Sequence, residues 1–352
     1  MIKRWLKARI AANERLFEQY WHVKLKLRSA RKLVYHWYDV SRVGRHMFWG
    51  RMQGQTQIQL QARLLFYYHK LEKGMCMPGA KRMFGGEAAD HVMRLLLAWE
   101  AKGFPTDDAI YRGALDSLLA YRDCLVALSL DKQGAVTRRV SAFLAPPRWP
   151  DSDAAAATTP LRLSLEHIDF ERHRQSLDEL YRIRRSFRDF APQAVERSVI
   201  DEAVRIAQLS PSACNRQPCR VHLADQPAIR DKLLAYQNGN RGFGDTAPLV
   251  LMVTADMRGF FDASERNQPY VDGGLFAMSL LLGLQAQGLV SCCLNWCVAP
   301  SADKAVHRHF GLDDAEAIIM LIAVGYPKAE TLVPLSHRKH VHDVVHRLEA
   351  VA

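Results

Sequence analysis

Residues 184–190 read RRSFRDF, and Arg182 lies two positions before them. Four arginines therefore fall within seven residues, and their like charges repel one another unless an anion or solvent offsets them. Guanidinium groups match phosphate oxygens with paired hydrogen bonds, and the Ser186 hydroxyl is a further donor. A solvated basic helix end is the alternative, because arginine also complements the helix dipole. The cluster alone leaves both interpretations open.

The sequence around this cluster predicts a domain with both helices and strands, beginning near residue 165. Helical periodicity covers 170–183 and 195–209, and Pro211 ends the second helix. Residues 220–224 form a short strand candidate. Continuous apolar runs at 248–253 and 317–325 indicate buried strands. Residues 273–288 are apolar on nearly every side, which is typical of a helix buried in a core or a subunit interface.

A second motif, SPSACNRQP at 210–218, follows the second of these helices. Its proline and small residues predict an exposed turn with free backbone N–H groups, and Asn215 and Gln217 add amide donors and acceptors. Such a turn suits a planar ligand with heteroatoms on its edge. A capping turn is the alternative.

The first half of the chain has a different character. Residues 1–75 hold 16 Lys and Arg against four Asp and Glu, whereas the rest of the chain, whose total net charge is +11, is close to neutral. A long basic amphipathic helix is predicted from residue 1 to about 40, with further helices at 88–103 and 108–128. We expect an all-helical, basic region at 1–144, a linker at 145–164 and a second domain at 165–352.

Six segments of the second domain together resemble the nitroreductase family of FMN-dependent proteins. Their order and spacing carry the resemblance, which covers about 170–352. The segments are RRSFRDF at 184–190, SPSACNRQP at 210–218, FGDTAPLVLMV at 243–253, GLQAQGLVSCCLNW at 283–296, AVGYP at 323–327 and HRKHVHDVV at 337–345. The resemblance implies an α+β, nitroreductase-like FMN-binding fold, with a central, mostly antiparallel sheet flanked by helices, after the helical N-terminal region.

The resemblance also implies a cofactor site and a partner. FMN phosphate would bind the arginine cluster together with a late arginine, and the 211–215 turn would reach the flavin of a partner subunit. Family members are typically homodimers, and Gly273, Gly274 and Gly283 would permit close helix contact. Asn240 and Arg241 are weaker candidates. The implied cofactor-binding residues are Arg184, Arg185, Ser186, Arg188, Pro211, Ser212, Ala213, Asn215, Leu294, Asn295 and Arg338.

The implied activity is that of an FMN-dependent oxidoreductase that takes hydride from NADH or NADPH and reduces a small organic acceptor. The fused helical region suggests a dedicated biosynthetic role, for which cell-surface polysaccharide assembly is the expected setting. Two alternatives are an FMN-dependent dehydrogenase or oxidase of a biosynthetic intermediate, and a flavin-binding scaffold without catalysis. No residue is assigned as a catalytic acid or base.

This sequence departs from the family pattern at two positions. Cys219 stands where an aromatic residue often follows QP, and Trp296 stands where glycine is common and could reshape or cover the flavin face. The segment HKLEKGM at 69–75 resembles one found in nitroreductase-like proteins linked to surface polysaccharide synthesis. A helix end with an exposed charged face is the alternative interpretation of its residues His69, Glu72 and Lys73.

The sequence also bears on a metal site and on other possible partners. Cys292, Cys293 and Cys297 lack a C-x-x-C pair, so no metal site is expected, although His307 and His309 follow. The basic, aromatic-rich N-terminal helix favours docking within the protein, then an anionic membrane surface or a polysaccharide-machinery partner. Nucleic acid is disfavoured because no binding motif is present. The chain is expected in the cytoplasm, with free thiols, or peripherally at the inner face of the membrane.

Overall fold

The computed structural model describes residues 13–50, 54–79, 82–146, 148 and 159–350. The first helical unit is a bundle of α3 (Gln57–Cys76), α4 (Gly86–Ala101), α5 (Ala109–Ala127) and α6 (Ala135–Leu144). Leucines of these helices meet around the buried Trp99 and Tyr121. The helices predicted at 88–103 and 108–128 correspond to α4 and α5, so the prediction of a helical N-terminal region is confirmed.

The second unit is built on a four-stranded antiparallel sheet. Its strands β1 (Cys219–Ala224), β2 (Leu249–Asp256), β4 (Glu316–Gly325) and β3 (Val290–Asn295) lie in that order across the sheet. The side chains of β2 are buried along its whole length, as its continuous apolar sequence predicts. The α+β class with an antiparallel sheet flanked by helices is confirmed.

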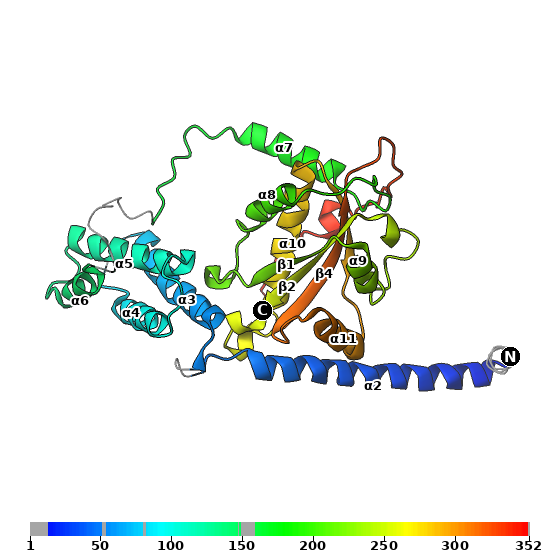
Figure 1. Ribbon diagram of the computed structural model, residues 1–352, viewed down its shortest axis with the longest axis horizontal. Helices are drawn as coiled ribbons and strands as arrows, with labels where there is room; N and C mark the ends of the chain where they lie inside the picture. Colours follow the sequence, from blue (N-terminus) through cyan, green and yellow to red (C-terminus); the bar gives the residue numbers. More distant parts are fainter. Residues whose placement is uncertain (1–12, 51–53, 80–81, 147, 149–158, 351–352) are drawn as a thin grey trace.

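Helices cover both faces of this sheet (Figure 1). One face packs against α8 (Arg197–Ala207) and α10 (Gln268–Ala286), and the other against α9 (Pro227–Leu234) and α11 (Pro300–Phe310). The helix α7 (Phe170–Ile183) runs along the top of the view and has no buried residue. Its bounds are those that the sequence predicts.

The helix α2 (Glu14–His46) extends as a single rod away from the rest of the chain (Figure 1). It begins at Asn13, whose side chain accepts from the Leu16 N–H, and it continues six residues beyond the predicted end near residue 40. Its last turns dock on the sheet domain through Arg42, which is 4% exposed and donates to the main-chain oxygens of Asp314 and Glu316. Trp5 and Leu6 of the predicted helix lie outside the described residues.

The predicted division at 1–144, 145–164 and 165–352 stays a prediction. The helix α2 contacts the sheet domain, whereas α3 to α6 form their own core. Residues 147 and 149–158 of the predicted linker lie outside the described part of the chain, and its last residues, 159–164, carry no helix or strand. Within the described residues no helix is both long and apolar enough to cross a bilayer.

Two glycines of α10 allow this helix to pack closely against other elements of its own chain. A Cβ built on Gly283 would lie 2.7 Å from the main-chain oxygen of Ala203 in α8, and one on Gly273 would lie 2.6 Å from Ile319. Nothing lies within 4 Å of a Cβ on Gly274. Two of the three glycines predicted to permit close contact therefore meet α8 and β4 of their own chain.

Gly283→Ala is expected to destabilise the protein by about 1–3 kcal/mol, because the added methyl group meets backbone that cannot rotate away. Gly274→Ala is the matched control in the same helix, and it should be neutral or stabilising by up to about 1 kcal/mol. Thermal unfolding of the two variants measures the difference. Equal melting temperatures would contradict the close approach of α8 and α10.

Candidate functional site

Three of the predicted arginines meet at one cavity of about 450 Å³. Arg184 is the C-cap of α7 and Arg185 follows it, while Arg338 arrives from the C-terminal segment more than 150 residues later. The cavity is lined by Tyr181, Arg182, Arg184, Arg185, Leu335, Ser336, His337 and Arg338, a set without a carboxylate. Arg182 pairs with Asp178 of α7, whereas the guanidinium groups of Arg184, Arg185 and Arg338 have no acidic partner among the described residues, an arrangement that suits an anion such as phosphate.

Ser186 and Arg188 take a different position. Ser186 bridges to Ser291 at the edge of β3, where the Phe187 N–H donates to the Ser291 oxygen at 3.1 Å. Arg188 donates to the Ser186 oxygen at 3.3 Å and lies 5.8 Å from the centre of the Phe243 ring. Neither residue lines the arginine cavity. Ser186 and Phe187 attach the segment after α7 to the sheet, and Arg188 contacts Ser186 and the Phe243 ring.

The open edge of β3 carries the main-chain groups of Asn295, one of the two predicted residues of this strand, and not those of Leu294. Because the Ser291 oxygen points to this edge and strand groups alternate, the main-chain groups of Cys293 and Asn295 point the same way. Leu294 instead pairs with Leu321 of β4, and its side chain is buried. The Asn295 oxygen accepts from Gln237 Nε2 at 3.0 Å. The outward amide near this point is therefore that of Cys293 or Asn295, and not that of Leu294.

The predicted turn at 211–218 is present and its backbone is strained. Cys214, Asn215 and Gln217 have positive φ angles of 50°, 53° and 49°, which side-chain-bearing residues rarely adopt. The turn contains the 3-10 helix η3 (Ala213–Asn215). Strained backbone of this kind persists only where surrounding contacts hold it, and it is common at ligand sites.

Hydrogen bonds hold the turn from two sides. The Ala213 N–H donates to the carboxylate of the buried Asp272 in α10 at 3.2 Å, and the Gln217 N–H donates to Ser212 Oγ at 3.0 Å. Burial raises the pKa of Asp272, although its hydrogen bonds from Gln268 and Ala213 oppose that shift. Asn215 is exposed, and Ser212 is half-buried.

Arg216 is the strongest anchor of the turn, and sequence reasoning missed it. Its side chain is 0% exposed, forms an ion pair with Glu265, and donates to the Gly259 oxygen at 3.0 Å. Its guanidinium lies 4.8 Å from the ring centre of Phe260 and 5.8 Å from that of Phe66 in α3. No local pattern marks an arginine between Asn and Gln as buried, because its partners lie as far away in the sequence as Phe66 and Trp49.

A small cavity of about 90 Å³ opens beside the turn. Burial raises the pKa of Cys219 in its wall to about 12, so this thiol stays protonated at neutral pH. Cys219 therefore contributes apolar surface and not a nucleophile. The cavity is lined by Gln208, Ser210, Pro211, Ser212, Gln217, Pro218, Cys219, Asp272 and Phe276.

The arginine cavity and the strained turn lie apart in one chain. In Figure 1 the C-terminal end of α7 lies at one end of the sheet. The segment η3 lies at the opposite end of the sheet, beside α3. One copy of the chain therefore holds both halves of the predicted site without joining them.

Comparison with known proteins agrees with the fold of the sheet domain. Residues 181–238 and 234–326 match the model of the Nitroreductase family. The C-terminal half is similar to the nitroreductase family. A 5,6-dimethylbenzimidazole synthase of Rhodobacter capsulatus is 26% identical over 193 residues, covering 49% of this chain and 93% of that protein.

Two further relatives cover the same nitroreductase-like half. Iodotyrosine deiodinase 1 of Homo sapiens is 23% identical over 220 residues, covering 52% of this chain and 75% of that protein. A protein of Exiguobacterium sibiricum, solved in complex with FMN, has a TM-score of 0.44 at 20% identity, covering 49% of this chain and 96% of that one.

Trp296, one of the departures from the family pattern, forms a hydrogen bond inside the nitroreductase-like half. Its indole N–H donates to Asp303 Oδ1 at 2.7 Å, and Asp303 also accepts from Tyr38 of α2 at 2.6 Å and from Arg42 at 3.3 Å. Burial and the Asp303 hydrogen bond raise the pKa of Tyr38. Trp296 therefore belongs to the docking site of α2, where a cavity of about 280 Å³ separates it from Tyr35.

The remaining candidates do not gather into a second site. Asn240 Nδ2 donates to the main-chain oxygens of Leu234 and Gln237, so it holds its own loop, and Arg241 is exposed. Among the described residues, no group of three or more His, Cys, Asp and Glu side chains is placed to hold a metal ion.

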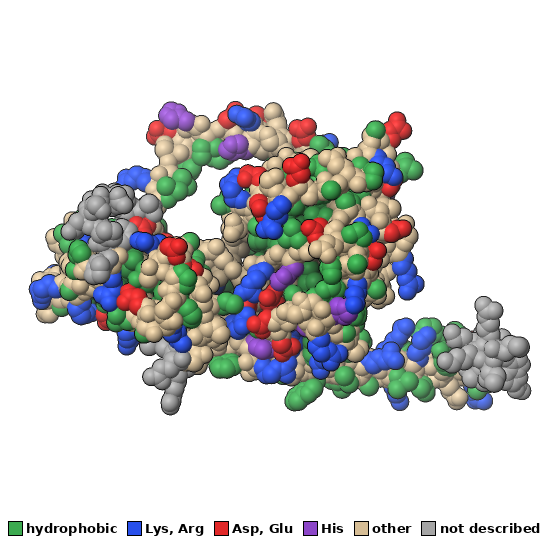
Figure 2. Space-filling model, in the orientation of Figure 1, with side chains coloured by type: hydrophobic (Ala, Val, Ile, Leu, Met, Phe, Trp, Pro, Cys, Tyr) green, Lys and Arg blue, Asp and Glu red, His purple; other side chains and the backbone are tan. Residues whose placement is uncertain are grey.

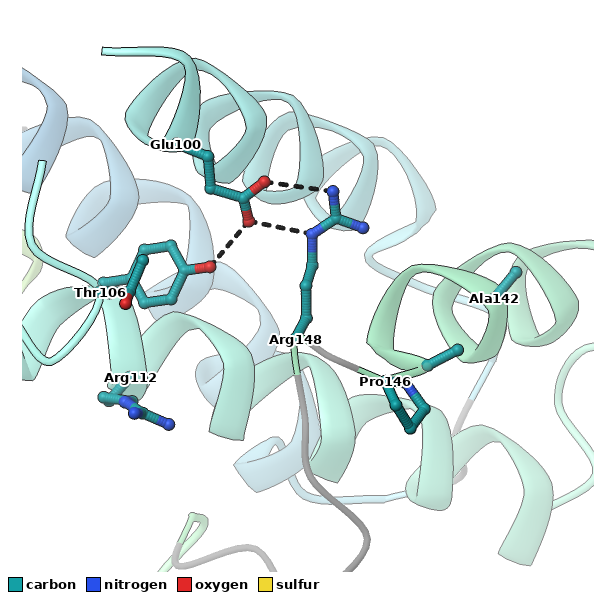
Figure 3. A pocket seen from close by; sticks show the side chains of 8 residues that line it. Glu100, Thr106, Arg112, Ala142, Pro146 and Arg148 are labelled. Carbon is teal, nitrogen blue, oxygen red and sulfur yellow. Dashed lines mark hydrogen bonds and ion pairs between the residues drawn. The ribbon is translucent and has the colours of Figure 1, made fainter. Parts of the chain in front are cut away.

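The helical bundle contains a cavity of about 470 Å³ between α4, α5 and α6 (Figure 3). Two of its charged groups, Glu100 and Arg148, are paired with one another. Arg148 Nε lies 2.9 Å from Glu100 Oε1, and the Tyr111 hydroxyl donates to the same oxygen at 2.7 Å. Burial alone would raise the pKa of Glu100, but these two hydrogen bonds lower it. Figure 3 shows Arg112 apart from this cluster.

Proposed function

We propose that the nitroreductase-like half binds FMN and that the protein is an FMN-dependent oxidoreductase. The observation that carries the proposal is the convergence of Arg184, Arg185 and Arg338 at one cavity without a carboxylate. Three guanidinium groups fit the phosphate of FMN in charge and in hydrogen-bonding geometry. The fit supports the cofactor that the similar proteins suggest.

Bound FMN would supply the hydride and electron transfer, with NADH or NADPH as the reductant and a small organic molecule as the acceptor. The chain's own residues bind and orient. The three arginines would hold the phosphate, and Ser186 with Phe187 keeps the following segment attached to β3. Asp272 and Arg216 fix the strained turn, whose Pro211, Ser212, Ala213 and Asn215 would contact the flavin.

We propose that the active form is a homodimer in which the turn of one copy meets the arginine cavity of the other. Two observations support this arrangement. The two halves of the site lie apart in one chain, and apolar side chains remain exposed near them. The exposed set includes Phe170, Leu177 and Tyr181 of α7, Val271 and Leu275 of α10, and Leu332, Leu335 and Val345 of the C-terminal segment.

The helical region suggests a dedicated biosynthetic reaction in the cytoplasm, with surface polysaccharide assembly as the proposed setting. The alternative of a scaffold without catalysis loses part of its support. Trp296 over the flavin ring would favour a scaffold, whereas its indole N–H is hydrogen-bonded to Asp303.

An absorption spectrum of the purified protein tests the proposal. We expect a flavin band near ~450 nm that bleaches when NADH or NADPH is added without oxygen. A protein that is colourless and cannot be reconstituted with FMN would overturn the cofactor assignment. A protein that holds FMN but is reduced by neither nucleotide would favour the oxidase or the scaffold.

A further inference from the structure

The helix α3 has a second packed face that points away from its own bundle. Ala62 is 3% exposed, yet it is not part of the bundle core that includes Leu60, Leu64 and Leu65. Phe66, one turn further along, packs edge-on against Trp49 and Phe261, with ring centres 5.4 and 5.3 Å away. This face therefore lies against the sheet domain.

This second face of α3 contacts the strained turn. The guanidinium of Arg216, inside the turn, lies 5.8 Å from the Phe66 ring, and Figure 1 shows α3 passing η3. Because a helix has about 3.6 residues per turn, His69 and Lys73 lie on the same face as Ala62 and Phe66. The HKLEKG segment thus continues the wall that α3 builds beside the turn.

The charges near this wall are mostly positive. Glu72 accepts from the Thr159 hydroxyl at 3.0 Å and lies 3.7 Å from His69, so its carboxylate is already engaged. Lys70 lies 4.2 Å from the ring centre of Phe66. Lys73 is exposed and has no acidic partner among the described residues. Figure 2 shows an opening between the bundle and the sheet domain, bordered by the segment before α7.

We propose that α3 forms one wall of the substrate site, and that Lys73 with His69 binds an anionic group, such as a carboxylate, of the organic substrate beside the 211–218 turn. This inference rests on the proposed function, because the turn is the element that would meet the flavin. The HKLEKG segment is then a specificity element of the oxidoreductase and not only a helix end.

Equilibrium binding to the full-length, FMN-loaded protein tests the inference. The probes are 4-nitrobenzoate and its neutral analogue 4-nitrobenzamide, followed by the change in the flavin absorption spectrum. We expect tighter binding of the benzoate. Lys73→Ala should weaken benzoate binding about tenfold, leave the amide unchanged and leave FMN content unchanged. Lys73→Arg should retain the preference, and His69→Gln should reduce it.

Lys132→Ala, an exposed lysine between α5 and α6, is the control and should change neither affinity. Equal affinities for the two probes, no binding of 4-nitrobenzoate, or equal weakening of both probes by Lys73→Ala would overturn the inference. Failure of the proposed function is separately visible, because a preparation without the flavin band removes the oxidoreductase and this site together. A flavin-containing protein without anion preference removes this site alone.

Discussion

Arg184→Gln combined with Arg338→Gln should weaken FMN binding by about 100-fold or more, while binding of riboflavin changes little. The two guanidinium groups come from segments 150 residues apart and line the same cavity. Each charge-assisted hydrogen bond to a phosphate oxygen contributes about 1.5–3 kcal/mol, and glutamine retains polarity without the charge. The effect should therefore be confined to the ligand that carries a phosphate.

Equilibrium titration of the apoprotein with FMN and with riboflavin measures this prediction. Arg197→Gln is the matched control, because Arg197 is exposed on α8 and pairs with Asp201 on the surface. It should leave both affinities unchanged. If the double variant lost riboflavin and FMN equally, the cavity would be needed for folding and not for the phosphate. If it kept its affinity for FMN, another site would hold the cofactor.

Arg216→Met should lower the melting temperature by about 6–20 °C, the second large effect expected from the structure. Arg216 is buried, pairs with the partly buried Glu265, and donates to two main-chain oxygens, those of Ala213 and Gly259. Removing one partner of a buried pair leaves the other charge without compensation, which costs about 3–5 kcal/mol. A domain of this size loses about 2–4 °C for each kcal/mol.

Thermal unfolding followed by circular dichroism checks this result. The double change Arg216→Met with Glu265→Gln should recover part of the loss, because it removes the unpaired carboxylate. Arg205→Met is the control, since Arg205 forms an exposed pair with Glu202 that is worth little in solvent. A melting temperature for Arg216→Met equal to that of the control would show that the turn does not depend on this arginine.

The same arginine connects the helical region to the candidate site. Its aromatic neighbours come from both sides of the junction, with Trp49 and Phe66 on the N-terminal side and Phe260 on the sheet side. Asp303 is a second connection, because it joins Trp296 to Tyr38 and Arg42 of α2. The N-terminal helices are therefore packed against the elements that would surround the cofactor.

The sequence by itself determined the elements whose signal is local. Periodicity placed α4, α5 and α7, and continuous apolar runs placed β2 and β4, since burial on every side leaves a pattern readable within about a dozen residues. The arginine cluster and the 210–218 turn were also visible, because their chemistry lies in adjacent residues. Leu294 was predicted as a cofactor-binding residue from its neighbours in the sequence, whereas its pairing with Leu321 of β4 is visible only in the folded sheet.

Only the tertiary structure decided which distant residues meet. Arg338 joins Arg184 across 154 positions, Arg216 meets Phe66 across 150, and Trp296 meets Tyr38 through Asp303. No propensity or spacing encodes such pairs, because they follow from how α2, α3 and the C-terminal segment pack on the sheet domain. The residue types that bind an anion are written along the chain, but which of their charges meet at one cavity, and so act together on one anion, is decided only in the folded molecule.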